Sequence, residues 1–256
     1  MKILRFDEIN STNAWLYDKI SEKHDISDTV IVAAHQTAGR GMGKNRWESE
    51  AGKNLLFSIA LNVNFLEAEN QFKISQAVSV AMVDTLAQFI DNQQLFIKWP
   101  NDIYFGEKKL AGILIQNTIE GNMMGVSIIG IGLNVNQIEF SKDIPNPISL
   151  KMITGKDFNL ENLLNILIIN IKKSVESLNS EKNQERINEK YISKSYRFGI
   201  WADYFYKNEI KSLKINGFDK YGRLLLIDKE GAGIVCDVKE LQFFPPSCRR
   251  GSEADV

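Results

Sequence analysis

The chain has 256 residues, of which 44% are hydrophobic and 25% charged, as in ordinary folded globular proteins. Its 31 lysines and arginines face 32 aspartates and glutamates, and the resulting net charge of −1 argues against general nucleic-acid binding. Two cysteines and two histidines are too few for a disulfide framework or a Cys/His zinc site, and no run is apolar enough for export or membrane insertion, so a cytoplasmic protein is predicted.

The first part of the chain mixes helix and strand patterns. Residues 11–20 begin with good N-cap residues and predict a short helix, and the apolar spacing over 72–90 predicts a longer one. Strands are predicted from β-branched or alternating apolar runs at 29–35, 55–63, 95–99, 109–117 and 124–132. These elements predict a sheet with helices packed against it.

The second part of the chain changes character at Tyr196. An apolar stripe from Leu160 to Leu178 predicts another helix, followed by a turn and a solvated helix. After Tyr196, three short strands separated by glycine-containing turns predict a small all-β appendage. The predicted domains are therefore 1–196 and 197–247, with a frayed polar tail at 248–256.

The segment from Gln36 to Trp47, QTAGRGMGKNRW, interleaves three glycines with cations after a predicted strand. Glycine lets backbone N–H groups approach a ligand closely, and the cations can neutralise phosphate or carboxylate. The spacing matches neither a P-loop nor a GxGxxG fingerprint. Both an anion-binding loop and a flexible basic surface loop are compatible with it.

FIKWPND (96–102) places Lys98 in an apolar strand directly before Trp-Pro. Ligands of α/β folds often bind where sheet strands end, but a lysine snorkelling from a strand end gives the same pattern. Asn101 and Asp102 are able to hold magnesium or a ligand, although Pro-Asn-Asp is also an ordinary turn.

Two further strands carry small residues. KKLAGILIQ contains Lys109 and Gly112, and IGIGLNVN contains Gly130 and Gly132 ahead of Asn134. Glycine in a strand marks either the close approach of a ligand or a plain bend of the sheet.

Taken in order, STN (11–13), QTAGRG…W, KWPND, KLAGIL and GxGLNVN resemble the biotin protein ligases, also called biotin–acetyl-CoA-carboxylase ligases. The resemblance runs from about Asp7 to Asn136, and NGFDKYGRLLLID is similar to the small SH3-like C-terminal domain of these enzymes. It implies an α+β fold, with a mixed sheet and flanking helices, plus a C-terminal SH3-like β-barrel. It also implies an enzyme that forms biotinyl-5'-adenylate from biotin, ATP and Mg²⁺ and then transfers biotin to a lysine of a biotin carboxyl carrier domain.

The same resemblance implies which residues act, and it leaves the metal ligands unknown. The catalytic cations would be Lys98 and Arg40. Biotin would be bound by Ser11, Thr12, Asn13, Gln36, Gly39, Arg40, Gly41, Lys98, Gly112, Gly130 and Gly132. ATP and the adenylate would be bound by Arg40, Trp47, Lys98, Asn101, Lys109 and Asn134. Because a carboxylate and an α-phosphate are both anions, fixed cations and backbone N–H groups should dominate catalysis.

The chain departs from the family pattern in two places. The usual loop GRGRxGRxW reads GRGMGKNRW here, so Met42 stands at the second arginine, while Lys44 and Arg46 are nearby but out of register. The chain therefore lacks, at this position, the arginine that the resemblance assigns to holding the adenylate. Only ten residues precede Ser11, so we expect no N-terminal winged helix and no specific DNA binding.

Rival functions come from other classes. A lipoate ligase of related fold should lack KWPND combined with GRG…W, a binding module would need only the pocket, and a repressor would need a DNA-binding domain. The expected partner is a biotin carboxyl carrier domain. A homodimer through an exposed sheet edge is compatible with the sequence, but no sequence pattern selects it.

Overall fold

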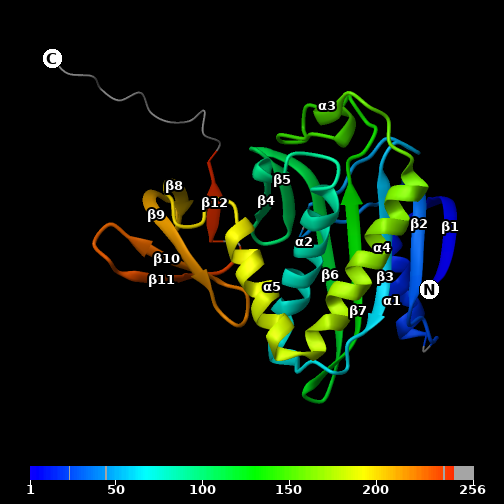
Figure 1. Ribbon diagram of the computed structural model, residues 1–256, viewed down its shortest axis with the longest axis horizontal. Helices are drawn as coiled ribbons and strands as arrows, with labels where there is room; N and C mark the ends of the chain where they lie inside the picture. Colours follow the sequence, from blue (N-terminus) through cyan, green and yellow to red (C-terminus); the bar gives the residue numbers. More distant parts are fainter. Residues whose placement is uncertain (23, 44, 239, 245–256) are drawn as a thin grey trace. The chain divides into compact units, whose positions relative to one another are not determined.

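A computed structural model describes residues 1–22, 24–43, 45–238 and 240–244 of the chain. By its internal contacts the chain divides into two compact units, Met1–Tyr196 and Arg197–Val256 (Figure 1). The tail predicted to fray, 248–256, lies outside the described residues. Within the described ranges, no helix is both long and apolar enough to cross a membrane.

The described part of the first unit is built on a seven-stranded mixed sheet in the order β1-β2-β3-β7-β6-β5-β4. Strand β1 runs parallel to β2, and every other neighbouring pair is antiparallel. The strands are β1 (Lys2–Ile9), β2 (Thr29–Gln36), β3 (Leu55–Asn62), β4 (Leu95–Lys98), β5 (Asp102–Phe105), β6 (Lys108–Glu120) and β7 (Met123–Leu133). The interior strand β3 is buried from Leu55 to Leu61, as expected where both faces of a sheet are covered.

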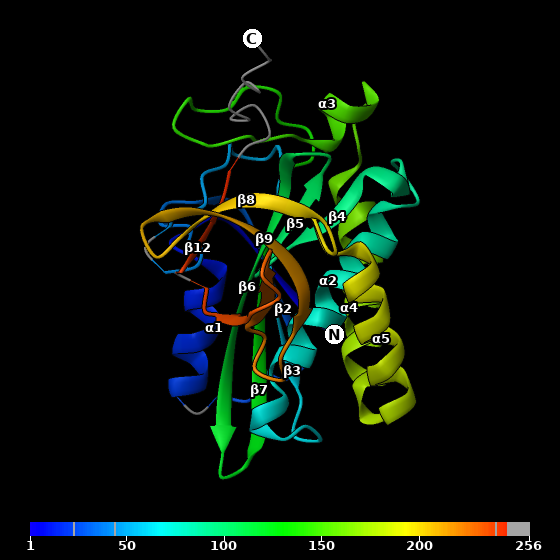
Figure 2. The same ribbon diagram turned by 90° about the vertical axis from the view of Figure 1, so that its left-hand side faces the viewer.

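Helices cover the two faces of this sheet unequally. Helix α1 (Thr12–Ser21) packs on β2, β3 and β7 on one face, which we call the α1 face. Helices α2 (Phe72–Leu86), α4 (Leu160–Glu176) and α5 (Glu181–Lys194) lie on the other face (Figure 2). The short helix α3 (Leu150–Thr154) and the 3₁₀ turns Ala68–Asn70, Asn92–Gln94 and Ser177–Asn179 complete the helical elements that the structure describes in this unit.

Caps and apolar spacing explain where these helices begin and which side they bury. The Ser11 hydroxyl accepts from the Ala14 N–H at 3.4 Å to start α1, and the Asn159 side chain accepts from the Asn162 N–H at 2.9 Å to start α4. The predicted stripe of α4 is its buried side, made of Leu163, Leu164, Leu167, Ile168, Ile171 and Val175.

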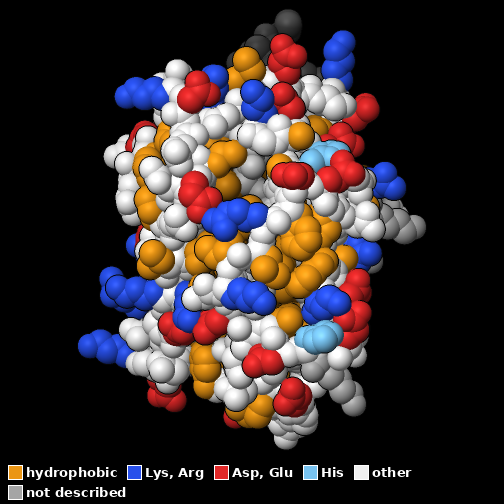
Figure 3. Space-filling view, turned by 90° about the vertical axis from the view of Figure 1, so that its right-hand side faces the viewer, with side chains coloured by type: hydrophobic (Ala, Val, Ile, Leu, Met, Phe, Trp, Pro, Cys, Tyr) orange, Lys and Arg blue, Asp and Glu red, His pale blue; other side chains and the backbone are white. Residues whose placement is uncertain are grey.

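Strand β1 forms one edge of the sheet and pairs with β2 from Lys2 to Ile9. Phe6 of β1 and Trp15 of α1 lie with their ring centroids 5.9 Å apart and pack on a buried cluster of the α1 face. A shallow groove on this edge, between β1 and α4, is lined by Met1, Ile3, Ile168 and Ile169 among others. On the side of the molecule drawn in Figure 3, hydrophobic side chains gather between charged ones.

The second unit, as far as it is described, is a five-stranded antiparallel sheet in the order β11-β10-β9-β8-β12. Its strands are β8 (Trp201–Tyr206), β9 (Glu209–Phe218), β10 (Leu224–Asp228), β11 (Gly233–Cys236) and β12 (Leu241–Phe243). Its buried residues include Tyr204, Leu213, Ile215, Leu224, Leu226 and Cys236. This arrangement fits the SH3-like domain that the resemblance implies.

The structure corrects some of the predicted elements. The three predicted C-terminal strands correspond to β9, β10 and β11, but the described residues form five strands. The prediction misses β8 and β12, and β12 has three residues, too few for a visible alternation. The helix predicted over 72–90 ends at Leu86, since the next N–H groups of Gln88 and Phe89 bond carbonyls three residues back. Periodicity also misses β1, whose exposed edge carries four charged residues, and the four-residue β5.

Candidate functional site

Polar side chains from three elements meet on the α1 face. The Thr12 N–H donates to Gln36 Oε1 at 2.8 Å, and the Thr12 hydroxyl lies 2.7 Å from Ser58 Oγ and 3.1 Å from Gln36 Oε1. Ser58 donates to Asn13 Oδ1 at 2.6 Å, and Asn13 Nδ2 donates to the Leu114 carbonyl at 3.0 Å. The structure therefore brings three of the predicted biotin residues into one hydrogen-bonded cluster.

Two buried serines belong to this region, and the sequence analysis predicts a role for only one of them. Ser11, predicted to bind biotin, is 3% exposed and caps α1. Ser58, which sequence reasoning misses, is fully buried in β3. The signal that would have found it is its position as the one polar residue in LLFSIAL, since a buried hydroxyl needs a hydrogen-bond partner.

The glycine-rich segment folds back on itself. The Trp47 N–H donates to the Gly39 carbonyl at 3.0 Å, and the Gly41 N–H donates to the Asn45 carbonyl at 2.9 Å. A Cβ atom at Gly39 would collide with the Trp47 carbonyl, so only glycine permits this close pairing. The pairing fixes the two ends of the segment, and with them the position of Trp47.

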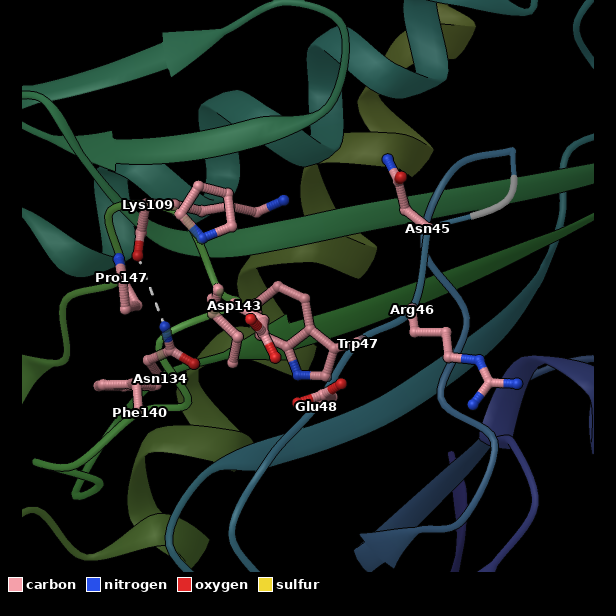
Figure 4. A pocket seen from close by; sticks show the side chains of 11 residues that line it. Asn45, Arg46, Trp47, Glu48, Lys109, Asn134, Phe140, Asp143 and Pro147 are labelled. Carbon is pink, nitrogen blue, oxygen red and sulfur yellow. Dashed lines mark hydrogen bonds between the residues drawn. The ribbon is translucent and has the colours of Figure 1, made fainter. Parts of the chain in front are cut away.

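The described cations of this loop face solvent. Arg40 and Arg46 pair with each other as an isolated backbone bridge, and both residues are exposed. Figure 4 shows the Arg46 side chain pointing away from Trp47. Met42 is half-buried, and Lys44 lies outside the described residues.

The Trp47 indole covers two of the predicted glycines. Gly112 in β6 and Gly132 in β7 are register partners, and a Cβ atom at Gly112 would come within 2.9 Å of Trp47 Cζ3. A Cβ atom at Gly132 would overlap the same indole, and one at Gly130 would overlap the side chain of Asn13. The three glycines thus make room for a tryptophan ring and an amide on the α1 face.

Lys98 ends β4 beside the phenol of Tyr104. Its Nζ donates to Tyr104 Oη at 2.9 Å and lies 4.7 Å from the centroid of that ring. Burial, together with the charge of Asp102 and the neighbouring Tyr196, raises the pKa of Tyr104, so the phenol keeps its proton and accepts from the ammonium group. Lys109 forms an ion pair with Asp102 at 2.7 Å. One lysine therefore pairs with a phenol and the other with a carboxylate at this edge of the sheet.

Strand register places these groups in one row. Lys98 pairs with Asp102 across β4 and β5, Asp102 with Gly112 across β5 and β6, and Gly112 with Gly132 across β6 and β7. Register partners project from the same face of a sheet. The row therefore leads from Lys98 to the glycine floor beneath Trp47.

A pocket of about 350 Å³ opens beside Trp47 (Figure 4). Trp47, Lys109 and Asn134, three of the residues predicted to bind ATP, line it together. Lys109 Nζ lies 5.5 Å from the Trp47 ring centroid, and Asn134 Nδ2 donates to the Ile148 carbonyl at 3.0 Å. The pocket thus combines an aromatic surface with a cation, which suits a nucleotide.

The outer wall of this pocket comes from a segment that sequence reasoning misses. The other lining residues are Asn45, Arg46, Glu48, Phe140, Asp143, Ile144, Pro145 and Pro147. The segment 140–147 has neither helical nor strand periodicity, and its attachment is tertiary: the Lys109 N–H donates to the Asn146 carbonyl at 2.7 Å, and the Ile148 N–H donates to the Lys109 carbonyl at 3.0 Å.

Three of the predicted nucleotide residues do not line this pocket as the structure describes it: Arg40, Lys98 and Asn101. The Asn101 side chain is turned into the protein, where Nδ2 donates to the Ile113 carbonyl at 2.6 Å. That contact, with the Ile113 N–H donating to the Asn101 carbonyl at 2.8 Å, ties the KWPND turn to β6.

Comparison with known proteins places these features in a family. Residues 5–134 match the model described as the Biotin/lipoate A/B protein ligase family, a match over half of the chain. The chain belongs to this family. The match to this ligase family includes the polar cluster, the glycine-rich loop and the row from Lys98 to Gly132, whereas the pocket wall 140–147 and the second unit lie outside it.

Relatives and solved structures agree with this assignment. The bifunctional ligase/repressor BirA of Bacillus spizizenii is 30% identical over 231 residues, which cover 88% of this chain and 66% of that protein. The biotin–[acetyl-CoA-carboxylase] ligase of Mycobacterium tuberculosis is 33% identical over 132 residues, 51% of this chain and 48% of that protein. The chain thus spans somewhat less than two thirds of the BirA relative. The solved structure of the Aquifex aeolicus biotin protein ligase with biotin and ATP matches with a TM-score of 0.73 and 27% identity, over 94% of this chain and 97% of that one.

Proposed function

We propose that this protein is a biotin protein ligase that forms biotinyl-5'-adenylate from biotin and ATP and then transfers biotin to a lysine of a biotin carboxyl carrier domain. The observation that carries the proposal is the cross-strand row from Lys98 to Gly132. On the α1 face it joins a polar cluster suited to a head group, a cationic edge suited to a carboxylate and a phosphate, and a pocket suited to adenine. The Aquifex aeolicus enzyme, solved with biotin and ATP, supports the same use of the fold.

Each group has a part in the reaction. Thr12, Asn13 and Gln36 bind the polar head of biotin, so that its carboxylate extends toward Lys98. The carboxylate oxygen attacks the α-phosphorus of ATP and pyrophosphate leaves, a step without proton transfer in which Lys98 and Arg40 neutralise the converging anions. The carrier lysine then attacks the acyl carbon as a free amine, AMP leaves, and the amine loses a proton.

Mg²⁺ enters as part of the ATP substrate in this proposal. Among the described residues, no three potential metal ligands of the His, Cys, Asp and Glu types come together. Asp102 is engaged by Lys109, and Asp143 is a single carboxylate on the nucleotide pocket. This sparse set fits an ion held mainly by phosphates and water rather than a dedicated protein site. The cytoplasmic location predicted from the sequence would give the enzyme access to ATP.

We assign catalysis to the first unit, Met1–Tyr196, and treat the second unit as the SH3-like domain of the enzyme. The division rests on the two compact units and on the sheets that each contains. The groups proposed to act belong to the first unit.

Pyrophosphate exchange tests the proposal directly. The protein is incubated with ATP, radiolabelled pyrophosphate and either biotin or lipoate, and label in ATP reports which acid is activated. We expect exchange with biotin alone, followed by labelling of a carboxyl carrier domain. Exchange with lipoate instead would make the protein a lipoate ligase, and biotin binding without exchange would make it a binding module.

A further inference from the structure

The polar cluster on the α1 face contains more oxygen–oxygen contacts than it has hydroxyl protons to make them hydrogen bonds. Gln36 Oε1, Thr12 Oγ1, Ser58 Oγ and Asn13 Oδ1 follow one another at 3.1, 2.7 and 2.6 Å. Amide oxygens only accept, and each hydroxyl has one proton, so two protons serve three contacts. Ser58 is 0% exposed and Thr12 and Asn13 are each 3% exposed, so water has little access to supply the third proton.

The two ends of this chain decide its direction. Asn13 Nδ2 donates to the Leu114 carbonyl, which can only accept, so the oxygen of the Asn13 amide must face Ser58. The Ser58 hydroxyl therefore donates a hydrogen bond to Asn13 Oδ1 and accepts one from the Thr12 hydroxyl across the 2.7 Å contact. Gln36 Oε1 is satisfied by the backbone N–H of Thr12 at 2.8 Å.

This direction also orients Gln36. With its oxygen on Thr12, its Nε2 lies on the side of Gly39, where a Cβ atom would come within 3.3 Å of it. The two amides thus each have one orientation, with a donor of Gln36 on the loop side and the oxygen of Asn13 above Gly130.

We propose that Ser58 is a positioning residue for recognition of a cyclic urea. It accepts a hydrogen bond from the Thr12 hydroxyl and donates one to Asn13, and so holds the side-chain amides of Asn13 and Gln36 in one orientation. The inference rests on the proposed function. A cyclic urea presents one acceptor oxygen between two N–H donors, so its site needs donors and acceptors at fixed places. An amide free to flip offers a donor where an acceptor is required, and a mismatched polar group in such a site costs affinity.

The test uses Ser58→Ala with Ser127→Ala as its matched control. Ser127 in β7 is also 0% exposed. Ser58 projects from the same face as its register partner Gly130, and Ser127, three residues from Gly130 along β7, projects from the opposite face. In biotin-dependent pyrophosphate exchange, Ser58→Ala should raise the KM for biotin about 3- to 10-fold and leave kcat and the KM for ATP within about twofold. Ser127→Ala should change none of the three.

A second comparison isolates the relay. Because Thr12 acts partly through Ser58, the double variant Thr12→Val/Ser58→Ala should raise the KM for biotin by less than the product of the two single effects. In the protein without ligand, the side-chain NH₂ resonances of Asn13 and Gln36 should shift in Ser58→Ala and not in Ser127→Ala.

The outcomes separate the two proposals. Biotin kinetics and NH₂ resonances in Ser58→Ala that match those of Ser127→Ala would overturn the positioning role, as would multiplied effects in the double variant. A wild-type protein that neither binds nor activates biotin would overturn the proposed function, and with it the positioning role of Ser58, before any variant is compared.

Discussion

Replacing Lys98 by alanine tests the cationic edge of the site. If this ammonium neutralises charge as the carboxylate meets the α-phosphate, Lys98→Ala should slow adenylate formation by roughly 10²–10³-fold, the effect of removing one preorganised donor. The protein should still fold. Single-turnover adenylate formation and thermal unfolding are the two measurements.

The structure predicts a small loss of stability and a large loss of rate for Lys98→Ala. Lys98 is partly exposed, and the loss of its hydrogen bond to the Tyr104 phenol should reduce the free energy of unfolding by about 1 kcal/mol. For a chain of this size, that corresponds to a decrease of about 2–4 °C in Tm. The predicted loss of rate is equivalent to about 3–4 kcal/mol, well above the stability term.

Two further variants sharpen the result. Tyr104→Phe keeps the ring but removes the oxygen that accepts from Lys98, so it should slow adenylate formation by only about 3- to 10-fold. Lys108→Ala removes an exposed lysine of the same sheet edge and should leave the rate unchanged. A Lys98→Ala protein that folds and reacts at the wild-type rate would refute the catalytic role and favour a lysine that merely snorkels from a strand end.

Three other predictions concern the loop and the glycine floor. Gly132→Ala should displace the Trp47 indole and raise the KM for ATP roughly tenfold, with a change in tryptophan fluorescence, whereas Gly233→Ala, where a Cβ meets no atom within 4 Å, should do neither. Met42→Arg should slow release of biotinyl-adenylate about 10- to 100-fold in a dissociation assay, and unchanged release would mean that another cation already fills the role. Hydrogen exchange of the amides in 39–47 should slow when biotin and ATP bind, and an unchanged profile would argue against a loop that closes over the adenylate.

How much of the site is predictable depends on whether a residue is marked by local sequence. Lys98 and the glycines of β6 and β7 stand in short motifs at strand ends, so their type and spacing already indicate a ligand site. Their alignment in one row, however, depends on strand register, which links Lys98 to Gly132 through Asp102 and Gly112. The sequence indicates the parts of the site, and register brings them together.

Ser58 and the pocket wall 140–147 illustrate what local sequence does not reveal. Ser58 matters because Thr12 and Asn13 reach it from a helix 45 residues away in sequence, a contact that no local pattern records. The wall is held by backbone bonds to Lys109 rather than by periodicity. The short strands β5 and β12 are missed for a related reason, because pairing with a neighbour defines them.

The loop from Gly39 to Trp47 fixes the position of Trp47 independently of the side chain at position 42. Gly39 and Trp47 pair at the base of the loop, and Gly41 pairs with Asn45 above them, while Met42 lies beyond these pairs. The indole is therefore positioned by the base and by the glycine floor, not by the side chain at position 42. A change at Met42 can thus alter the charge available to the adenylate without moving Trp47. It follows that Met42→Arg should affect adenylate release while leaving tryptophan fluorescence unchanged, and Gly132→Ala should change both the fluorescence and the KM for ATP.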